Sequence, residues 1–381
     1  MEALAKDVIV VGGGMIGCAA ALELAARGRS VVVLERGYIG AQSSGTNFGL
    51  LRRQDRYPGQ LPLANRAASM WFEIEDRLGE PVEFVPHGHL RFALTDEDMA
   101  IIERYAEEAR PFGFEFDILG RAECRRRWPW LGPNVVGGGF CADDGSANPR
   151  LVTPAIARKA QAGGALMLEE QDVTEARHAG GRFVVETRQG LRCEAPVLIN
   201  TAGAWAHHIA SQFGETVPLN PIGPPEAVTE PVPFFMTTAI QRVGSTVVLR
   251  QVKRGNVILA GKPRGFADNV TNRAYVAPAS TLANMRKALD AMPVLANLNI
   301  IRVWSGIEVA TNDNLPVIGP SATTPGLFHA FGFSGHGFQI GPAVGAVLSE
   351  LVVDGRTPTP IDPFAITRFT AAAPAATPAS H

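Results

Sequence analysis

The chain has 381 residues, of which 46% are hydrophobic and 19% are charged, an ordinary globular composition with enough apolar material for a large core. The formal net charge is −2 at pH 7 and no basic stripe is interleaved with aromatic residues, which argues against a nucleic-acid-binding surface. The four cysteines include no C-x-x-C pair, so the pattern favours buried thiols over a zinc ribbon or a dithiol redox site.

A βαβ unit opens the chain. Residues 7–11 form a continuous apolar run, which is typical of a strand buried on both faces. Residues 15–27 are rich in alanine and leucine and predict a helix, which ends at Gly28. Residues 30–34 predict a second buried strand, and Glu35 stands at its end.

The turn between the first strand and this helix carries a G-x-G-x-x-G motif at Gly12, Gly14 and Gly17. Gly12 permits a tight turn, Gly14 lets a pyrophosphate approach the backbone, and Gly17 lets helix and strand pack closely. The N-terminus of the helix offers free N–H groups to the phosphates. Glu35 is placed to accept hydrogen bonds from ribose hydroxyls. The pattern predicts a dinucleotide site, because a glycine-rich turn without a ligand leaves Glu35 unexplained, but it does not separate FAD from NAD.

Loops and helices alternate over the next part of the chain. Residues 40–49 predict a loop, and a helix with Trp71 is expected to run to about Leu78. Residues 95–98 predict an N-cap with an acidic first turn, and residues 151–161 predict a further helix.

The remainder is rich in strands. Residues 165–200 contain several short β-type runs, and residues 217–309 combine many prolines with alternating strands, which favours a mixed or antiparallel sheet. A strand, a glycine loop and a helix return over residues 327–353. Residues 371–381 are rich in alanine, proline and threonine and predict a disordered tail.

Six segments together carry a family pattern: DVIVVGGGMIG at 7–17, LER at 34–36, SSG at 43–45, NTAGAW at 200–205, LPVIG at 315–319 and GFSGHGFQ at 332–339. In these motifs the sequence resembles the D-amino-acid oxidase and glycine oxidase superfamily of FAD-dependent oxidoreductases, over nearly the whole chain. Within it, SSGTNFG with the following RRQ looks most like the flavin subunits of opine oxidases, hydroxyproline dehydrogenases and hydrogen cyanide synthase.

The resemblance implies an α/β fold with two domains. A Rossmann-like FAD-binding domain is expected from residues 1–80, 149–216 and 310–370. A second, α+β domain with a mixed or antiparallel sheet is expected to bind the substrate, and residues 81–148 and 217–309 would form it.

The resemblance also assigns positions to FAD. Ser43, Ser44 and Gly45 would contact the pyrophosphate and the flavin edge, and Val173 would hold the adenine through its backbone. The N–H groups after the C-terminal glycine loop would stabilise negative charge on the pyrimidine side of the flavin. The full implied set is Gly12, Gly14, Met15, Ile16, Gly17, Glu35, Arg36, Ser43, Ser44, Gly45, Asn47, Phe48, Val173, Ala202, Gly203, Gly332, Gly335, His336, Gly337, Phe338 and Gln339. FAD is expected to bind without a covalent link, because no cysteine to which the flavin could be attached follows Cys193.

Candidate catalytic residues are Arg52, Glu308 and His336. Glycine oxidase relatives have an arginine that clamps the substrate carboxylate where this chain, aligned on Trp304 and LPVIG, has Glu308. Glu308 suits a cationic amine or guanidinium, and the alternative is an ion pair with a protein arginine such as Arg302. Arg52 or its neighbour Arg53 would then clamp a carboxylate, with the other one a surface charge.

His336 has two interpretations, a group beside the flavin or a turn residue that donates a local hydrogen bond. His87 and His89 lie on one face of a possible strand, but no further ligands accompany them, so no metal site is predicted.

The implied reaction is oxidation of the C–N bond of an amino acid, an imino acid or an opine-like secondary amine, by hydride transfer to flavin N5. Sarcosine-oxidase relatives carry a lysine on a substrate-domain strand that helps oxygen react, and the match of residues 257–261 places Leu259 there. Lys262 lies past a glycine and need not reach the ring, so a dehydrogenase is predicted rather than an oxidase. The alternatives are that Lys262 folds back over the flavin, or that another cation such as His336 or Arg52 does the same work.

The expected partners are a small-molecule amine or amino acid and an electron acceptor, which is a quinone, a dye or a partner subunit. The second hypothesis is a flavin-binding assembly or electron-relay subunit of a heteromeric oxidase, and the third is an NAD-dependent dehydrogenase. No stretch suits a transmembrane helix and no secretory signal is visible, so a cytoplasmic protein is expected.

Overall fold

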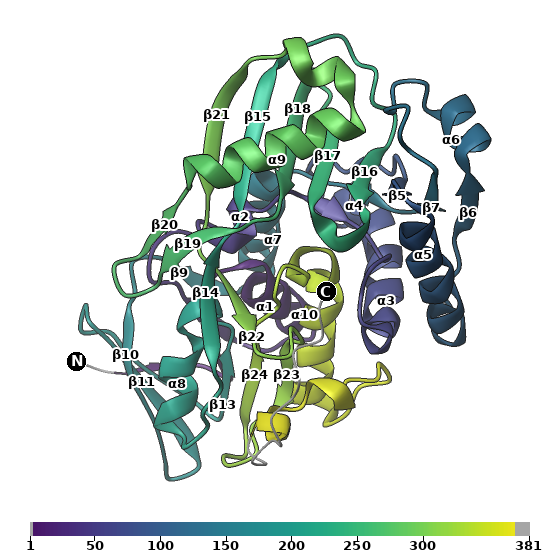
Figure 1. Cartoon of the computed structure of the whole chain (residues 1–381). Coiled ribbons are helices and arrows are strands. Elements are labelled where there is room, and N and C mark those ends of the chain that lie inside the picture. Colours follow the sequence, from purple (N-terminus) through teal and green to yellow (C-terminus); the bar gives the residue numbers. More distant parts are fainter. Residues whose placement is uncertain (1–2, 370–381) are drawn as a thin grey trace.

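A six-stranded, mostly parallel sheet forms the centre of the lower half of the molecule (Figure 1). The computed structural model describes residues 3–369, so the predicted tail at 371–381 lies outside the described residues. The strand order is β23-β24-β13-β2-β3-β9, and only β23 runs antiparallel to its neighbour. The strands are β2 (Val8–Val11), β3 (Val31–Leu34), β9 (Leu166–Leu168), β13 (Val197–Asn200), β23 (Val317–Pro320) and β24 (Leu327–Phe331). Strands β2 and β3 are fully buried, which confirms the interpretation of both apolar runs.

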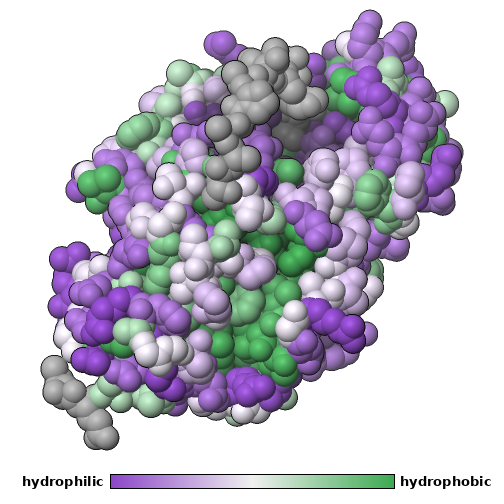
Figure 2. Space-filling view, turned by 90° about the horizontal axis from the view of Figure 1, so that it is seen from below, coloured by the Kyte–Doolittle hydropathy of each residue, from purple (hydrophilic) through white to green (hydrophobic). Residues whose placement is uncertain are grey.

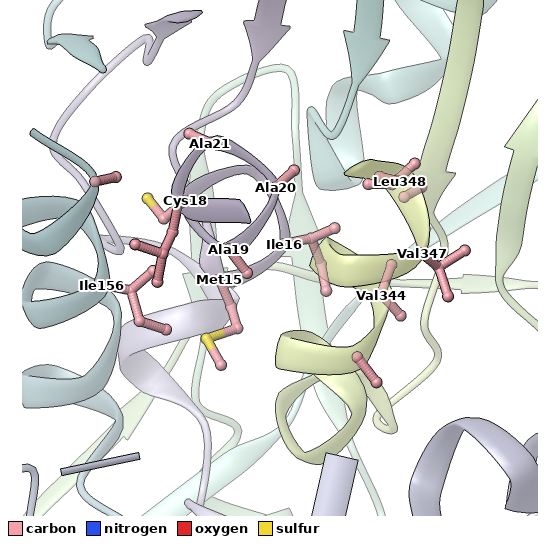
Figure 3. Packing of buried hydrophobic residues seen from close by; sticks show 14 of the residues in the cluster. Met15, Ile16, Cys18, Ala19, Ala20, Ala21, Ile156, Val344, Val347 and Leu348 are labelled. Carbon is pink, nitrogen blue, oxygen red and sulfur yellow. The ribbon is translucent and has the colours of Figure 1, made fainter. Parts of the chain in front are cut away.

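Helices cover one face of this sheet. Helix α1 (Met15–Ala26) lies between α7 (Pro149–Ala162) and α10 (Gly337–Asp354), with Ile156 on one side and Val344 on the other (Figure 3). The packing is close because small residues meet, since a Cβ added to Gly345 would lie 2.5 Å from Cβ of Ala19. Helix α3 (Leu61–Phe72) packs on the outer side of α10.

The opposite face is covered by a four-stranded sheet in the order β1-β12-β11-β10 and by helix α8 (Ala206–Gln212). Its strands are β1 (Leu4–Ala5), β10 (Val173–Ala179), β11 (Arg182–Thr187) and β12 (Arg192–Ala195). Phe183 and Val185 of β11 belong to the same buried cluster as Ile9 and Leu198 of the central sheet.

An eight-stranded mixed sheet dominates the upper half, in the order β21-β15-β18-β17-β16-β5-β7-β6 (Figure 1). Its strands are β5 (His89–Ala93), β6 (Asp117–Gly120), β7 (Gly137–Cys141), β15 (Pro225–Pro231), β16 (Ala239–Arg242), β17 (Val247–Gln251), β18 (Asn256–Gly261) and β21 (Ile300–Ser305). Only β16 and β5 pair in parallel. Helix α9 (Pro278–Ala291) packs on one face, which leaves the other face for the site.

Two smaller sheets connect these halves, in the orders β20-β19-β14-β22 and β4-β8. Their strands are β4 (Leu50–Leu51), β8 (Gly145–Ser146), β14 (Leu219–Gly223), β19 (Gly265–Asp268), β20 (Arg273–Tyr275) and β22 (Glu308–Thr311).

The remaining helices confirm one of the predictions made from the sequence and correct two others. Helix α5 (Asp96–Ala109) begins as predicted, because the Thr95 hydroxyl accepts a hydrogen bond from the Asp98 N–H at 3.1 Å. The predicted loop at 40–49 contains a one-turn helix, α2 (Ser43–Thr46). The helix predicted to run to Leu78 is divided into α3 and α4 (Ile74–Leu78). Helix α6 (Arg121–Arg127) is short and its arginines are exposed.

The surface combines a polar rim with apolar areas. Seen from below, hydrophobic residues gather in the middle of the face and hydrophilic residues surround them (Figure 2). Within residues 3–369, none of the helices has the length and apolar character that crossing a membrane requires. The four cysteines are buried and free, which confirms the prediction made from their spacing.

Candidate functional site

A cavity of about 2650 Å³ lies between the two large sheets. On one side it is lined by the loops that follow β2, β3, β13 and β24, and on the other by the face of the eight-stranded sheet that α9 leaves open. The carboxyl ends of parallel strands meet at one edge of a sheet, which is where open α/β folds bind ligands. The sequence motifs far apart along the chain therefore meet around one space.

Nearly all of the predicted cofactor residues line this cavity. They are Gly12, Gly14, Met15, Ile16, Glu35, Arg36, Ser43, Ser44, Asn47, Phe48, Val173, Ala202, Gly203, Gly332, Gly335, His336, Gly337, Phe338 and Gln339. Gly17 and Gly45 are the exceptions. A Cβ on Gly17 would lie 2.0 Å from the Gly12 carbonyl oxygen, so Gly17 serves close packing, and a Cβ on Gly45 would lie 2.2 Å from the Gly40 carbonyl oxygen.

The first turn of α1 forms a cradle with the serine loop. Gly12 has a φ of +108°, and a Cβ there would lie 2.4 Å from the Thr201 carbonyl oxygen, so only glycine fits. The Met15 N–H donates a hydrogen bond of 2.8 Å to the Ser44 hydroxyl. A Cβ on Gly14 would stand 3.0 Å from the same hydroxyl, so the glycine keeps this wall open to a phosphate.

Glu35 is held firmly at the end of β3. One of its carboxylate oxygens accepts the Gly13 N–H and the other accepts the Gly37 N–H, both at 2.7 Å. A carboxylate oxygen can accept two hydrogen bonds, so each retains one position for a ribose hydroxyl. Arg36, next along the chain, lies with its guanidinium carbon 3.9 Å from the ring centre of Trp205.

The serine loop is fixed from both ends. The Ser43 hydroxyl donates to the Ile307 carbonyl oxygen, and the Asn47 amide donates to the Ser43 carbonyl oxygen at 2.9 Å. The Arg250 guanidinium lies over the ring of Phe48 at 5.3 Å and donates to the Phe48 carbonyl oxygen at 2.8 Å. Asn47 therefore shapes the loop, while Phe48 presents its ring to the cavity.

His336 caps α10 beside the cavity. Its carbonyl oxygen accepts the Arg56 guanidinium at 3.0 Å, and its buried Nδ1 has no hydrogen-bond partner among the described residues. Burial holds the pKa of His336 well below its usual range, and Arg52, Arg56, Arg264 and Lys262 lower it further. The imidazole is therefore neutral at physiological pH.

Glu308 opens β22 and lines the cavity. Burial raises the pKa of Glu308, and Arg264 opposes that shift. Both side chains flank Gly335, because a Cβ there would lie 3.3 Å from Arg264 Nη2 and 3.9 Å from Glu308 Oε1. Arg302 is exposed, with its guanidinium carbon 6.0 Å from the ring centre of Trp304, so Arg264 rather than Arg302 is the protein arginine beside Glu308.

The neighbouring arginines Arg52 and Arg53 lie in different surroundings. Arg52 lines the cavity, and its Nη1 donates to the backbone oxygens of Gln54 and Asp55. Arg53 does not line it, because its Nε binds Asp144 Oδ1 at 3.0 Å in a largely buried ion pair. The expectation that one of the two is a surface charge is therefore wrong.

Several charged residues of the cavity wall escape prediction from the sequence. They are Arg56, Arg91, Glu226 and Arg264, and Lys262, which is not expected to reach the site, lines it as well. Lys262 follows β18 and lies two residues after Ala260, so the two-residue period of the strand is the signal that could place it on the cavity side. Burial lowers the pKa of Lys262, and Arg264 and Arg52 add to that effect.

These residues fit FAD. The glycine cradle and the Glu35 carboxylate match a pyrophosphate and a ribose, as described above. Further along the wall, His336 Nδ1 and both amide atoms of Gln60 are buried without partners among the described residues, and Gln60 is 1% exposed. Such groups require a ligand or water with donors and acceptors of its own, as the polar edge of a flavin has.

Known proteins agree with this geometry. The family model described as FAD dependent oxidoreductase matches residues 7–351. A glycine oxidase of Geobacillus kaustophilus is 28% identical over 95% of this chain and 97% of its own length, and one of the subunits of an opine oxidase of Rhizobium meliloti is 26% identical over 96% and 98%. The crystal structure of L-proline dehydrogenase from P. horikoshii has a TM-score of 0.89 and 27% identity, covering 97% of this chain and 99% of that one. The dinucleotide is therefore FAD rather than NAD, and the chain belongs to the DAO family of FAD-dependent oxidoreductases.

Proposed function

We propose that the protein oxidises the C–N bond of an amino acid, an imino acid or an opine-like secondary amine. The observation that carries the proposal is one continuous cavity, which begins at the glycine cradle and ends at a charged wall on the eight-stranded sheet. FAD, when bound, supplies the acceptor for the two electrons that leave the substrate. The similarity to an oxidase of glycine, a subunit of an opine oxidase and a proline dehydrogenase supports this substrate class.

The chain's own residues orient the cofactor and the substrate. When FAD binds, the N–H groups of the first turn of α1 would hold the pyrophosphate, Glu35 would hold the ribose, and the Val173 backbone would hold the adenine. The glycine loop before α10 would contact the flavin, and neutral His336 can donate one hydrogen bond. The segments 1–80, 149–216 and 310–370 form the cofactor domain in this proposal, and 81–148 and 217–309 form the substrate domain.

Arg52 is proposed to bind the substrate carboxylate. It lies on the cavity wall, and the hydrogen bonds that its Nη1 makes to two backbone oxygens fix the guanidinium in place. A held guanidinium suits a carboxylate, because its planar donors match both oxygens. Positioning of this kind is most of what amine oxidation requires of a protein.

The decisive experiment is an anaerobic screen of the FAD-loaded chain. D-amino acids, N-methyl amino acids, cyclic imino acids and opines are added in turn, and bleaching of the visible flavin absorbance is followed, then turnover with a dye acceptor. Reduction of the flavin by at least one of these classes, with release of the matching carbonyl product, is expected. Reduction by none of them would contradict the proposal.

FAD is expected to be bound tightly but without a covalent link. Some relatives attach flavin through a cysteine in the segment that here reads Ser305, Gly306 and Ile307, and within residues 3–369 no cysteine lines the cavity. Acid precipitation should therefore release the yellow colour into the supernatant. Colour that stays with the denatured, proteolysed pellet would show that the link is covalent.

Glu308 is expected to govern the preference for substrate charge. Glu308→Arg should shift the substrate preference towards small amino acids with a plain carboxylate. The ratio of their kcat/KM to the kcat/KM of cationic substrates should rise by roughly tenfold or more. Its position beside Arg264 on the cavity wall supports this role. An unchanged ratio together with a lower melting temperature would mean that Glu308 is only a structural partner of Arg264.

A second candidate function is a flavin-binding assembly or electron-relay component of a heteromeric oxidase. It is favoured by the similarity to the opine oxidase protein named above and to the beta chain of a sarcosine oxidase of Rhizobium meliloti, which is 26% identical over 95% of this chain and 88% of its own length. A relay component would bind FAD but show no turnover alone with a dye acceptor, so the same screen separates the two.

A further inference from the structure

One cross-strand row of the eight-stranded sheet faces the cavity from end to end. The pairing places Glu226 opposite Ala260, Ala260 opposite Val248, Val248 opposite Gln241 and Gln241 opposite Arg91, and all five line the cavity. Four strand spacings separate the ends of this row, which is about 19 Å. The row therefore has a carboxylate at one end and a guanidinium at the other, with the apolar side chains of Ala260 and Val248 and the amide of Gln241 between them.

The two charged side chains at the ends of this row differ in whether another residue of the protein pairs with them. Arg91 is paired with Asp55, whose Oδ1 lies 2.6 Å from its guanidinium. Glu226 is 4% exposed, and its buried Oε2 has no hydrogen-bond partner among the residues that the structure describes. A buried carboxylate oxygen without a partner is costly in a folded protein, so this atom is the feature of the wall that most requires a ligand.

Arg250 is the cation that acts most strongly on Glu226, but it already has other partners. Its Nε donates to the Phe48 carbonyl oxygen at 2.8 Å, and its Nη1 lies 3.4 Å from the Ser146 hydroxyl. Burial raises the pKa of Glu226 well above its usual range in spite of Arg250 and the smaller effect of Arg150. The protein's own cations therefore do not compensate the burial of this carboxylate.

A second carboxylate of the cavity wall adds to this cost. Glu308 lines the same cavity from β22, where it pairs with Ile222, four residues before Glu226 along the chain. Its charge raises the pKa of Glu226 further, and burial raises the pKa of Glu308 in spite of Arg264. Two desolvated carboxylates that repel each other are both stabilised by one positive charge placed between them. The pair thus differs from an ordinary acidic cluster on a solvated surface.

We propose that Glu226 and Glu308 form an acidic subsite for an ammonium or guanidinium group of the substrate other than the amine that is oxidised. The inference rests on the proposed function. The reacting amine must be neutral when the hydride leaves the adjacent carbon, because its lone pair forms the C=N bond, and two carboxylates beside it would instead favour its protonated form. The charge that they receive therefore belongs to another part of the molecule. With Arg52 on the wall for a carboxylate, the substrate class is an amino acid, free or N-substituted, with a basic side chain.

Binding of two isosteric probes to the FAD-loaded protein tests the subsite without turnover. Methylguanidinium is positively charged and methylurea is its neutral counterpart, and each is titrated while the visible flavin spectrum and the melting temperature are followed. Wild type should prefer methylguanidinium. Glu226→Gln, which keeps the shape of the side chain, should bind methylguanidinium about tenfold or more weakly and methylurea as before. Equal binding of both probes to wild type overturns the proposal.

A matched control excludes a general effect of charge. Glu103→Gln removes one carboxylate from an exposed position of α5 that does not line the cavity, and it should bind both probes as wild type does. Glu226→Asp restores the charge and should recover part of the preference, which a variant that is merely unfolded would not do. A preference that survives in Glu226→Gln overturns the assignment of Glu226.

Pairs of charged and neutral substrates show whether the subsite proposal or the proposed function fails. Arginine and citrulline, in both enantiomers and as Nα-methyl derivatives, differ only in side-chain charge, and kcat/KM should favour the arginine member in wild type but not in Glu226→Gln. Oxidation of other amines without any such preference overturns the subsite and leaves the proposed function standing. If the variant keeps the preference and instead shifts the pH profile of kcat, Glu226 acts on the reacting amine and the subsite is wrong. Failure of every amine to reduce the flavin refutes the proposed function itself.

Discussion

FAD affinity should fall by roughly 2–4 kcal/mol when Glu35 is replaced by alanine, because the variant loses the hydrogen bonds of both ribose hydroxyls to a charged acceptor. The same carboxylate also holds the Gly13 and Gly37 N–H groups at 2.7 Å. If the loss of these bonds makes the two loops more mobile, the loss of FAD affinity should lie at the upper end of this range. Titration of the apoprotein with FAD, followed by quenching of flavin fluorescence, measures the change.

Glu169→Ala is the matched control for this variant. Glu169 accepts the Ile39 N–H at 2.8 Å in the same loop but does not line the cavity, so its loss should leave FAD affinity almost unchanged. Glu35→Gln should have an intermediate effect, because it keeps an acceptor and loses the charge. If Glu35→Ala binds FAD as tightly as wild type, the carboxylate does not hold the ribose.

Reoxidation of the reduced enzyme by oxygen should slow roughly 100-fold in Lys262→Met. A positive charge near the reduced cofactor stabilises the superoxide that forms first, and the structure places Lys262 on the cavity wall, near enough to His336 to lower its pKa. The reason for predicting a dehydrogenase, that no lysine reaches this region, is thereby removed. Stopped-flow mixing of the reduced protein with air-saturated buffer measures the rate.

Lys253→Met, which removes an exposed lysine outside the cavity lining, should reoxidise as wild type does. An unchanged rate in Lys262→Met would mean that Arg52 or Arg264 supplies the charge. Wild-type reoxidation as fast as substrate turnover, with stoichiometric hydrogen peroxide, would identify an oxidase, and slow reoxidation would identify an enzyme that passes electrons to a dye, a quinone or a partner subunit.

The cofactor half of the fold could be predicted because its signals are local. The buried strands and the turn at Gly12 each depend on residues within one turn or one strand, and the N-cap at Thr95, in the substrate half, is predictable for the same reason. The break between α3 and α4 could not be predicted in the same way. The helix after the break is held by contacts with residues beyond its end, since the Glu75 carboxylate accepts the Val82 and Phe84 N–H groups at 2.8 and 3.1 Å.

The residues on the substrate side of the cavity could not be placed from the sequence, because contacts between segments far apart along the chain bring them together. Adjacent arginines give no sign of which one faces the cavity, and Asp144, which binds Arg53, lies far along the chain. Glu226 looks like any strand glutamate until β18 and β21 pair with its strand and bury it. The position of Lys262 is missed for a similar reason, since the family match favours Leu259 as the cavity-facing residue, whereas the pleat presents Ala260.

The strand order β23-β24-β13-β2-β3-β9 has a consequence for how the protein is made. Strand β2 emerges from the ribosome well before its neighbour β13, which is synthesised only after residue 196, and α10, which packs on α1, follows later still. The glycine cradle lacks the Thr201 backbone that Gly12 packs against throughout this interval. The side of α1 that faces α10 therefore stays uncovered in the nascent chain until α10 has been synthesised, a period in which aggregation competes with folding. Flavin supply can stabilise the protein only after that point, because a ligand stabilises a fold only once its site exists.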